Sequence, residues 1–392
     1  MREFKYIKRL VLKEWLPLIA VFLIVAVSCA VITASSHNYY NDNVFPVTNF
    51  VWPASVLALV MPFFVFSYRF SRVGGDTYYQ LPFKEKRFKN LRVLTGLCAI
   101  LSVLLIAFII GYITFLVTYL NKPDVYTYSG FGYSEKLYKV NIAPAYMLIA
   151  LPISIVFVAG LYFVNAAIVS LHNRLPSAIV YAIIVQTILN FMLPCFGAYL
   201  EYYFTDGTYA AEFATRSLIL SPGIVGVNTL TTQFGTGKSF FLDSTVGNIF
   251  DTIDIRMANG IYDDLIETIL LLAVDVLIYA GAGALTMLSS EPSGEYNGTS
   301  GARKPYQNYL IYILTIEMAL ISSTIASSSI FLYAFLVILY TAGLYVFTSI
   351  YLGTFKVGAK HGLLIGGSAL FLILFPIISS VCASAAYIGH AV

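Results

Sequence analysis

The sequence predicts an all-α polytopic membrane protein, and three observations lead to that fold class. Of the 392 residues, 59% are hydrophobic and only 11% are charged, whereas soluble domains carry roughly 25% charged residues. Nine apolar stretches each approach or exceed the roughly 20 residues that a helix needs to cross a bilayer. The cations gather between these stretches and at the N-terminus instead of spreading along the chain. A soluble globular fold is therefore excluded.

The nine apolar stretches are expected to form membrane-spanning helices with short polar connections. The expected helices are residues 16–36, 51–70, 94–120, 144–171, 177–203, 262–288, 309–327, 330–352 and 362–386. Residues 289–308 are rich in Gly, Ser and Asn and are expected to form a cytoplasmic linker. This linker separates six N-terminal spans from three C-terminal ones.

The N-terminal stretch before the first span, residues 1–15, has the pattern of an amphipathic helix. Phe4, Ile7, Val11 and Trp15 recur at helical spacing, and residues 1–15 also hold five cations. Such a helix lies on a membrane surface with its apolar face in the lipid. Most of the 23 Lys and Arg residues fall on the side of the membrane where this order of spans places residues 1–15. The positive-inside rule therefore predicts a cytoplasmic N-terminus.

The longest segment on the opposite side covers residues 205–261. It contains an apolar piece, residues 218–226, that is interrupted by Pro222 and Gly223. Irregular backbone at membrane depth is tolerated only where protein or water surrounds it. This piece is therefore expected to be a re-entrant or interfacial element.

The most basic segment of the chain, residues 69–92, lies between the second and third spans and holds seven cations. Gly74 and Gly75 interrupt the preceding helix, and Asp76 can cap the start of a new one. We expect a short helix near the cytoplasmic membrane face, with Phe83 and Phe88 directed toward bilayer or protein. Two interpretations remain open: a signal for topology alone, or a docking surface for a soluble partner.

Two acidic residues fall inside expected spans, Asp275 in the sixth and Glu317 in the seventh. A charge at the bilayer centre costs about 2.5–3.5 kcal/mol on insertion scales. Each carboxyl is therefore expected to be protonated, paired, or next to a watery cavity. One interpretation is a substrate or proton pathway. The other is hydrogen bonding between helices, with Asn165, Gln186, Asn190 or a tyrosine as the partner.

Several chemistries find no support in the sequence. The four histidines lack metal-ligand spacing, and neither a nucleophile elbow nor a catalytic acidic pair is present. No catalytic residue and no metal ligand is predicted. Basic residues interleaved with aromatic ones are confined to the segment 69–92, so nucleic-acid binding is not expected.

Two motifs together suggest a family. The first is Asp76-x4-Leu81-Pro82-x4-Arg87-x8-Gly96-Leu97, and the second is Ser290-Glu291-x2-Gly294. They resemble motifs of the permease subunits of type-2 ATP-binding-cassette (ABC) exporters of Gram-positive bacteria. The likeness covers roughly the first 300 residues. The chain departs from the family in having Met287-Leu288-Ser289 where basic residues usually precede Ser-Glu, and in its longer segment between the fifth and sixth spans.

The resemblance implies a six-helix exporter core over residues 16–288, followed by about three extra C-terminal helices within 309–392. It implies a connecting helix at 1–15, and a coupling helix at 75–90 that docks onto a cytoplasmic ABC ATPase subunit. The docking residues that it implies are Asp76, Leu81, Pro82, Lys84, Lys86, Arg87 and Phe88.

The resemblance also implies the partners and the location. Permease subunits of this family work in pairs, so a second copy or a sister permease is expected beside the ATPases and the membrane lipid. ATP and Mg²⁺ would bind the partner ATPase, and this chain would bind no cofactor. The location would be the bacterial cytoplasmic membrane. The re-entrant element near Pro222 and Gly223 has a counterpart in the family.

The expected function is that of a permease subunit, without enzymatic activity of its own, in an exporter of amphipathic or hydrophobic cargo such as a peptide, antibiotic or lipid. One alternative is an ion-coupled secondary transporter that uses Asp275 and Glu317. Another is a non-transporting membrane sensor or accessory subunit. The identity of the cargo cannot be read from the residues.

Overall fold

The structure, a computed structural model, is described here for most of the apolar helices and for one hairpin. The residues described are 11–36, 48–70, 85–123, 125–130, 133–138, 144–172, 175–204, 276–288, 304–326, 330–352, 355–356 and 358–390. Within them, four helices are long and apolar enough to cross a bilayer: Leu16–Ser36, Lys86–Asn121, Ile330–Ser349 and Ala359–Val381. The prediction of a helical, multi-pass membrane protein is confirmed at this level.

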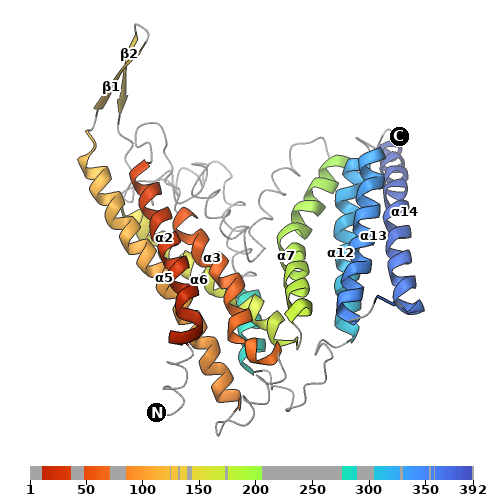
Figure 1. Ribbon diagram of the computed structural model, residues 1–392. Coiled ribbons are helices and arrows are strands. Elements are labelled where there is room, and N and C mark those ends of the chain that lie inside the picture. Colours follow the sequence, from red (N-terminus) through yellow and green to blue (C-terminus); the bar gives the residue numbers. More distant parts are fainter. Residues whose placement is uncertain are drawn as a thin grey trace. The chain divides into compact units, whose positions relative to one another are not determined.

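Most helices begin and end close to where the apolar stretches predict (Figure 1). Helices α2 (Leu16–Ser36) and α13 (Ile330–Leu352) have the expected bounds at both ends. The others that agree within a few residues are α6 (Pro144–Ser170), α7 (Leu175–Phe204), α12 (Lys304–Ala326) and α14 (Ala359–His390). The described part of the sixth expected span is the helix Val276–Leu288. Hydropathy therefore predicts the ends of a helix well where polar residues flank its apolar stretch.

The second span ends earlier than expected. Helix α3 covers Thr48–Val65, and the chain then tightens into the 3-10 turn η2, Ser67–Phe70. The amide N–H of Phe66 still donates to the carbonyl of Pro62, over 3.0 Å. Such a tightened last turn is common at a helix end.

The third span begins earlier than expected. Helix α5 runs from Glu85 to Asn121 without interruption, and residues 85–90 form its first turns. Residues 85–90 of the expected coupling helix 75–90 are therefore continuous with the third span, and residues 75–84 lie outside the described part. The reason is local: residues 85–95 contain no Gly or Pro, and Glu, Lys, Arg and Leu are good helix formers.

Sequence reasoning missed a β-hairpin that follows α5. Strands β1 (Val125–Gly130) and β2 (Tyr133–Tyr138) pair antiparallel, with register from Val125 opposite Tyr138 to Gly130 opposite Tyr133. The sequence Val-Tyr-Thr-Tyr has high β propensity, and glycine at the turn permits the tight connection. At the N-terminus, a π-helical turn η1 (Val11–Trp15) leads into α2. Residues 1–10 of the expected amphipathic helix lie outside the described part.

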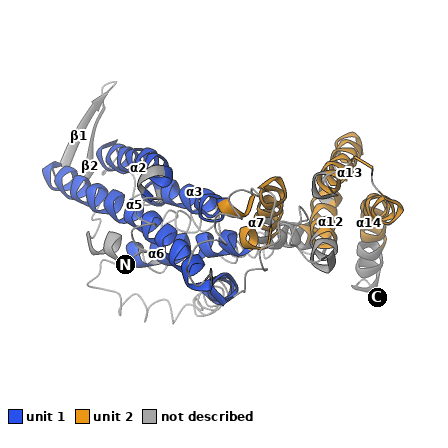
Figure 2. Ribbon diagram, turned by 60° about the horizontal axis from the view of Figure 1, so that its bottom comes forward, with its two compact units in different colours: residues 1–67, 77–167, 222–293 blue, residues 68–76, 168–221, 294–392 orange. Residues whose placement is uncertain are grey.

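The chain forms two compact units, which Figure 2 shows in different colours. The first comprises residues 1–67, 77–167 and 222–293, and the second comprises residues 68–76, 168–221 and 294–392. Helices α2, α3 and α5 pack together in the first unit. In the second unit, α7, α13 and α14 pack against α12. Helix α7 therefore belongs with the C-terminal helices.

Small residues let the helices of the first unit approach closely. On α2, Ala26, Ala30 and Ala34 are fully buried. A Cβ added at Gly111 of α5 would lie 2.6 Å from Cε2 of Phe50 and 3.0 Å from Cβ of Ala30. Small side chains are the usual means of close packing between membrane helices, because no hydrophobic driving force separates apolar side chains from lipid.

Hydroxyl groups connect the helices of the second unit. The hydroxyls of Thr315 (α12) and Tyr340 (α13) lie 2.8 Å apart, and Thr315 Oγ1 is also 3.3 Å from Ser368 Oγ on α14. The Tyr199 hydroxyl of α7 donates to Ser379 Oγ of α14 over 3.0 Å. Each such bond between membrane helices contributes on the order of 0.6 kcal/mol.

Replacing Gly111 by alanine tests the close packing of α5. Because the added methyl group overlaps Phe50 and Ala30, we expect Gly111→Ala to lower the free energy of unfolding by about 1–3 kcal/mol. The matched control is Gly343→Ala on α13, where an added Cβ has no atom within 4 Å. This control is expected to be neutral or stabilising, since alanine is the better helix former. Thermal unfolding in detergent measures both, and equal effects would contradict the packing argument.

Candidate functional site

Residues 85–92 of the basic segment form the first turns of α5. Their side chains lie on two faces of the helix, one exposed and one buried. Lys86 and Arg87 are exposed, whereas Lys89 and Arg92 are 1% and 2% exposed. Residues three and four apart share a face of a helix. Lys89 and Arg92, three residues apart, share the buried face with Phe88, and Lys86 and Arg87 lie at the surface. Counting charges in the sequence does not distinguish the exposed cations from the buried ones.

The buried face holds the start of α5 in place within the first unit. Phe88 is 1% exposed, so it contacts protein, one of its two expected surroundings. Arg92 Nη2 donates to the carbonyl oxygen of Phe64, 3.4 Å away near the end of α3. The aliphatic stem of a buried arginine packs as an apolar group while its guanidinium reaches such an acceptor. The end of α3 and the start of α5 are thereby joined.

A second contact anchors the next turn. The buried hydroxyl of Tyr162 on α6 donates to the carbonyl of Val93 over 2.8 Å. A Cβ added at Gly96 would lie 2.7 Å from this hydroxyl and 2.8 Å from Cγ2 of Val65. Gly96 belongs to the first family-like motif, and its packing role gives a physical reason for glycine there.

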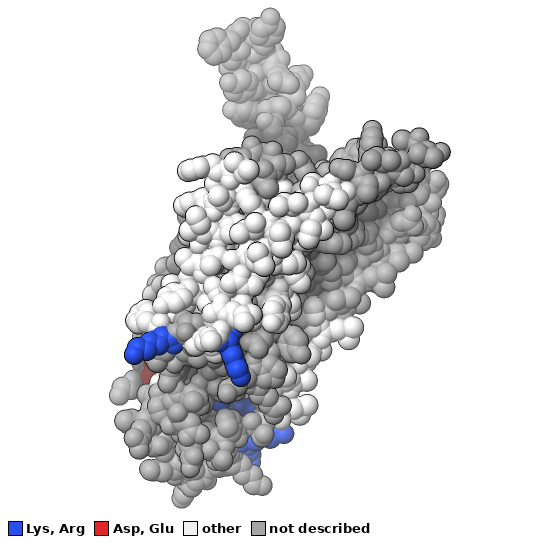
Figure 3. Space-filling view, turned by 90° about the vertical axis from the view of Figure 1, so that its right-hand side faces the viewer, with Lys and Arg blue, Asp and Glu red and all other residues white. Residues whose placement is uncertain are grey.

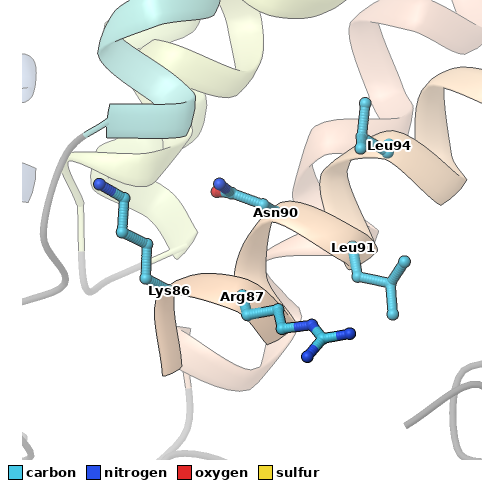
Figure 4. A pocket seen from close by; sticks show the side chains of 5 residues that line it. All are labelled: Lys86, Arg87, Asn90, Leu91 and Leu94. Atoms are coloured by element: carbon cyan, nitrogen blue, oxygen red, sulfur yellow. The ribbon is translucent and has the colours of Figure 1, made fainter. Parts of the chain in front are cut away.

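The other face of α5 is at least partly exposed at its described residues. A shallow hollow of about 520 Å³ lies along it. Its described lining comes from α5 alone and consists of Lys86, Arg87, Asn90, Leu91 and Leu94, as Figure 4 shows. Two cations at one end and two leucines at the other make this face amphipathic. We call these five residues the α5 face.

Arg69, at the other end of the basic segment, is buried and forms a contact that stabilises the fold. It is 8% exposed, and its Nη1 donates to the carbonyl of Ser170 at the end of α6. This contact lies within the second unit. The guanidinium of Arg69 thus donates to a carbonyl at the C-terminal end of α6, where the last carbonyl groups have no hydrogen-bond partner inside the helix.

His172, in the turn after α6, has the most strongly shifted pKa of the described groups outside the helices. Its ring is fully buried and lies 4.6 Å from the ring of Tyr181. Nδ1 is 2.8 Å from the carbonyl of Ile168, so it is the protonated nitrogen, and Nε2 has no hydrogen-bond partner within the described chain. Burial lowers the pKa of His172 to about 4, the Arg69 charge acts in the same direction, and the Ile168 carbonyl opposes them. The imidazole is therefore neutral at physiological pH.

Of the two acidic residues within expected spans, the structure describes Glu317. It lies on α12, 1% exposed, and its Oε2 has no hydrogen-bond partner in the described residues. Asn165, one of the partners considered, donates instead to the carbonyl of Leu59 over 3.1 Å. The Glu317 carboxyl is thus buried within the second unit.

The remaining predicted residues are not placed. Those outside the described part are Asp76, Leu81, Pro82, Lys84, Pro222, Gly223 and Asp275. Of the predicted docking residues, the structure therefore places Lys86, Arg87 and Phe88, and puts Phe88 on the opposite side of α5 from the exposed pair. Within the same limits, no group of three or more His, Cys, Asp or Glu side chains is arranged to hold a metal ion.

Sequence reasoning missed the roles of Arg69 and His172. The available signal was their position directly after apolar helices, where terminal carbonyls need donors. Comparison with known proteins adds no assignment, because no protein-family model, curated protein or solved structure matches the chain.

The buried His172 predicts a loss of stability in acid. The unfolded chain takes up a proton near pH 6.5, whereas the folded chain resists protonation until about pH 4. The free energy of unfolding should therefore be complete above about pH 6.5 and fall by up to about 3 kcal/mol as the pH drops toward 4. Thermal unfolding across this range measures the slope.

His172→Gln should flatten this dependence, because glutamine does not titrate. The control is His361→Gln at the start of α14, where the side chain is only partly buried; this variant should keep the wild-type slope. An unchanged slope in His172→Gln would show that other groups cause the acid sensitivity.

Proposed function

We propose that the chain is the permease subunit of an ATP-driven exporter of the ABC type, with the α5 face as its contact to a cytoplasmic ATPase. The observation that carries this proposal is the division of α5. An exposed pair of cations stands beside two leucines, on a helix whose other face is anchored by Phe88, Arg92 and the Tyr162–Val93 hydrogen bond. A docking surface needs both exposure and a rigid base.

The chemistry of the α5 face defines the partner. Lys86 and Arg87 attract an acidic surface, and complementary charge mainly raises the association rate and fixes the orientation of docking. Leu91 and Leu94 supply apolar area that a partner side chain can bury. The partner surface is therefore amphipathic, with carboxylates opposite the cations.

Mechanical coupling follows from the length and continuity of α5. The helix runs for 37 residues without a break, so a push at Glu85 is transmitted along its hydrogen-bonded axis. Helices α2 and α3 pack directly against α5. Closure of an ATPase against the α5 face would move these helices together and change the path for cargo.

The distribution of charge supports a cytoplasmic position for this end of α5. All Lys and Arg residues of α5 lie in its first turns: Lys86, Arg87, Lys89 and Arg92. In the view of Figure 3, the Lys and Arg side chains that are visible lie in the lower half of the picture. By the positive-inside rule, an end rich in cations faces the cytoplasm. We place the N-terminus on the same side and the protein in a bacterial cytoplasmic membrane.

The remaining parts of the proposal come from the family resemblance. ATP and Mg²⁺ bind the ATPase, and this chain carries no nucleotide chemistry. A second copy or a sister permease completes the complex. The cargo is amphipathic or hydrophobic, and the apolar helices are compatible with a peptide, an antibiotic or a lipid.

Charge reversal on the α5 face tests the proposal. The double variant Lys86→Glu/Arg87→Glu should reduce recovery of an ABC ATPase with the tagged chain by about tenfold or more, because like charges would then meet at the interface. The assay is purification in mild detergent from the native host, with mass spectrometry and ATP hydrolysis on the eluate. Correct insertion of the variant is checked by its thermal unfolding.

The matched control reverses two other exposed cations, Lys356→Glu/Lys360→Glu, beside and within the start of α14. This variant should retain the ATPase at the wild-type level. If the wild-type chain recovers no ABC ATPase, the assignment to this class is wrong. If both double variants retain it equally, the α5 face is not the docking surface.

A further inference from the structure

The second unit contains a buried acidic residue that the proposed function does not use. Glu317 lies on α12, which packs against α7, α13 and α14. Its side chain is 1% exposed, and Oε2 is removed from solvent without a hydrogen-bond partner among the described residues. A carboxyl group in this condition is rare, because buried polar atoms are nearly always satisfied.

The helices around α12 offer little charge to compensate a carboxylate. Helix α13 contains no Lys, Arg, His, Asp or Glu, and the one such residue in α7 is Glu201, close to its end. Those of α14 lie at its two ends: Lys360, His361 and His390. On α12 itself, the other charged residue is Lys304 at the first position. The middle parts of α7, α12, α13 and α14 thus contain no Lys, Arg or His.

Among the side chains that the structure describes, tyrosine hydroxyls are the remaining titratable groups on these helices. Tyr340 of α13 is near enough to interact electrostatically with Glu317, and its hydroxyl lies 2.8 Å from Thr315 Oγ1. Thr315 in turn donates to the carbonyl of Ile311 over 2.7 Å. The other tyrosines of α13 and α7 whose side chains the structure describes are Tyr333, Tyr345, Tyr181 and Tyr199. Tyr333 and Tyr199 donate to α14, and Tyr345 donates to the carbonyl of Phe355.

The energetics favour a neutral side chain. An ionised carboxylate at the bilayer centre costs about 2.5–3.5 kcal/mol on insertion scales, and a nearby cation or several hydrogen bonds would be needed to offset that cost. Protonation removes the charge and replaces an acceptor by an O–H donor. Neutral hydroxyl bonds already connect α12, α13 and α14, so a neutral acid fits the same environment.

We propose that Glu317 is a proton-binding site, protonated in the closed helical bundle of the second unit. On release, the O–H bond breaks, the proton passes to water, and the electron pair remains on the carboxylate. Among the described residues the resulting charge has no partner, so we expect proton release to loosen the packing of α12 or to admit water. This inference goes beyond ATPase docking and does not depend on it, because it concerns the bundle alone.

The test compares the full chain with Glu317→Gln in detergent, by thermal unfolding from about pH 5 to about pH 9. Glutamine mimics the neutral acid in size and charge. We expect the two proteins to melt alike at the acid end. As the pH rises above the pKa of a glutamate in the unfolded chain, the wild type should lose about 3 °C or more relative to the variant, because the unfolded chain releases its proton while the folded chain retains it. Glu14→Gln, at an exposed acid, is the control and should follow the wild type throughout.

A chemical readout complements the unfolding experiment. Apolar carbodiimides react with protonated carboxyl groups, so modification of the peptide that contains Glu317 should decrease severalfold as the pH rises. Mass spectrometry locates the adduct and separates Glu317 from Asp275. The peptide from Glu317→Gln should carry no adduct at position 317.

Three results would overturn the proposal. If Glu317→Gln is destabilised increasingly as the pH rises, the native group is an ionised carboxylate with a partner. If the difference between wild type and variant is constant across the range, Glu317 does not exchange a proton there. If added Na⁺ stabilises the wild type and not the variant at high pH, and the variant is also less stable at acid pH, the site binds a metal cation instead.

Discussion

The low polarity of a bilayer interior is the constraint from which the described structure follows. A charge or an unpaired backbone group there costs several kcal/mol, so helices satisfy the backbone and charged side chains collect at helix ends. Lys86 and Arg87 at the start of α5, and Lys360 at the start of α14, obey this rule. Arg92 obeys it in another way, by donating to the carbonyl of Phe64. Glu317 is the exception that needs a separate explanation.

The same constraint explains how the two units are held together internally. In the first unit, small residues such as Ala30 and Gly111 allow backbones to approach, and van der Waals contact supplies the stabilisation. In the second unit, hydroxyl groups such as those of Thr315 and Tyr340 supply short bonds between helices. Both devices work without charge, and both leave apolar side chains free to contact lipid.

Hydropathy alone predicted most of the helices, because flanking polar residues mark the ends of α2 and α13 sharply. It failed at the end of α3 and the start of α5, where polar residues still belong to helical turns. It also failed at the hairpin, whose Tyr and Thr residues have no hydropathy signal. For the site, the family resemblance singled out Lys86 and Arg87 as docking residues. Sequence reasoning assigned no role to Arg69, because the contact of Arg69 is with Ser170, which is distant in sequence.

The length of α5 has a mechanical consequence. Its 37 residues rise about 55 Å at 1.5 Å each, while the hydrocarbon layer is only about 30 Å thick. Even with an ordinary tilt of about 20°, several turns must extend past the lipid tails into the headgroups and water. If a helix of this length tilts as a rigid rod, its projecting ends are displaced further than its buried middle. Any force applied at Glu85 would consequently be felt at the hairpin that begins just after Asn121.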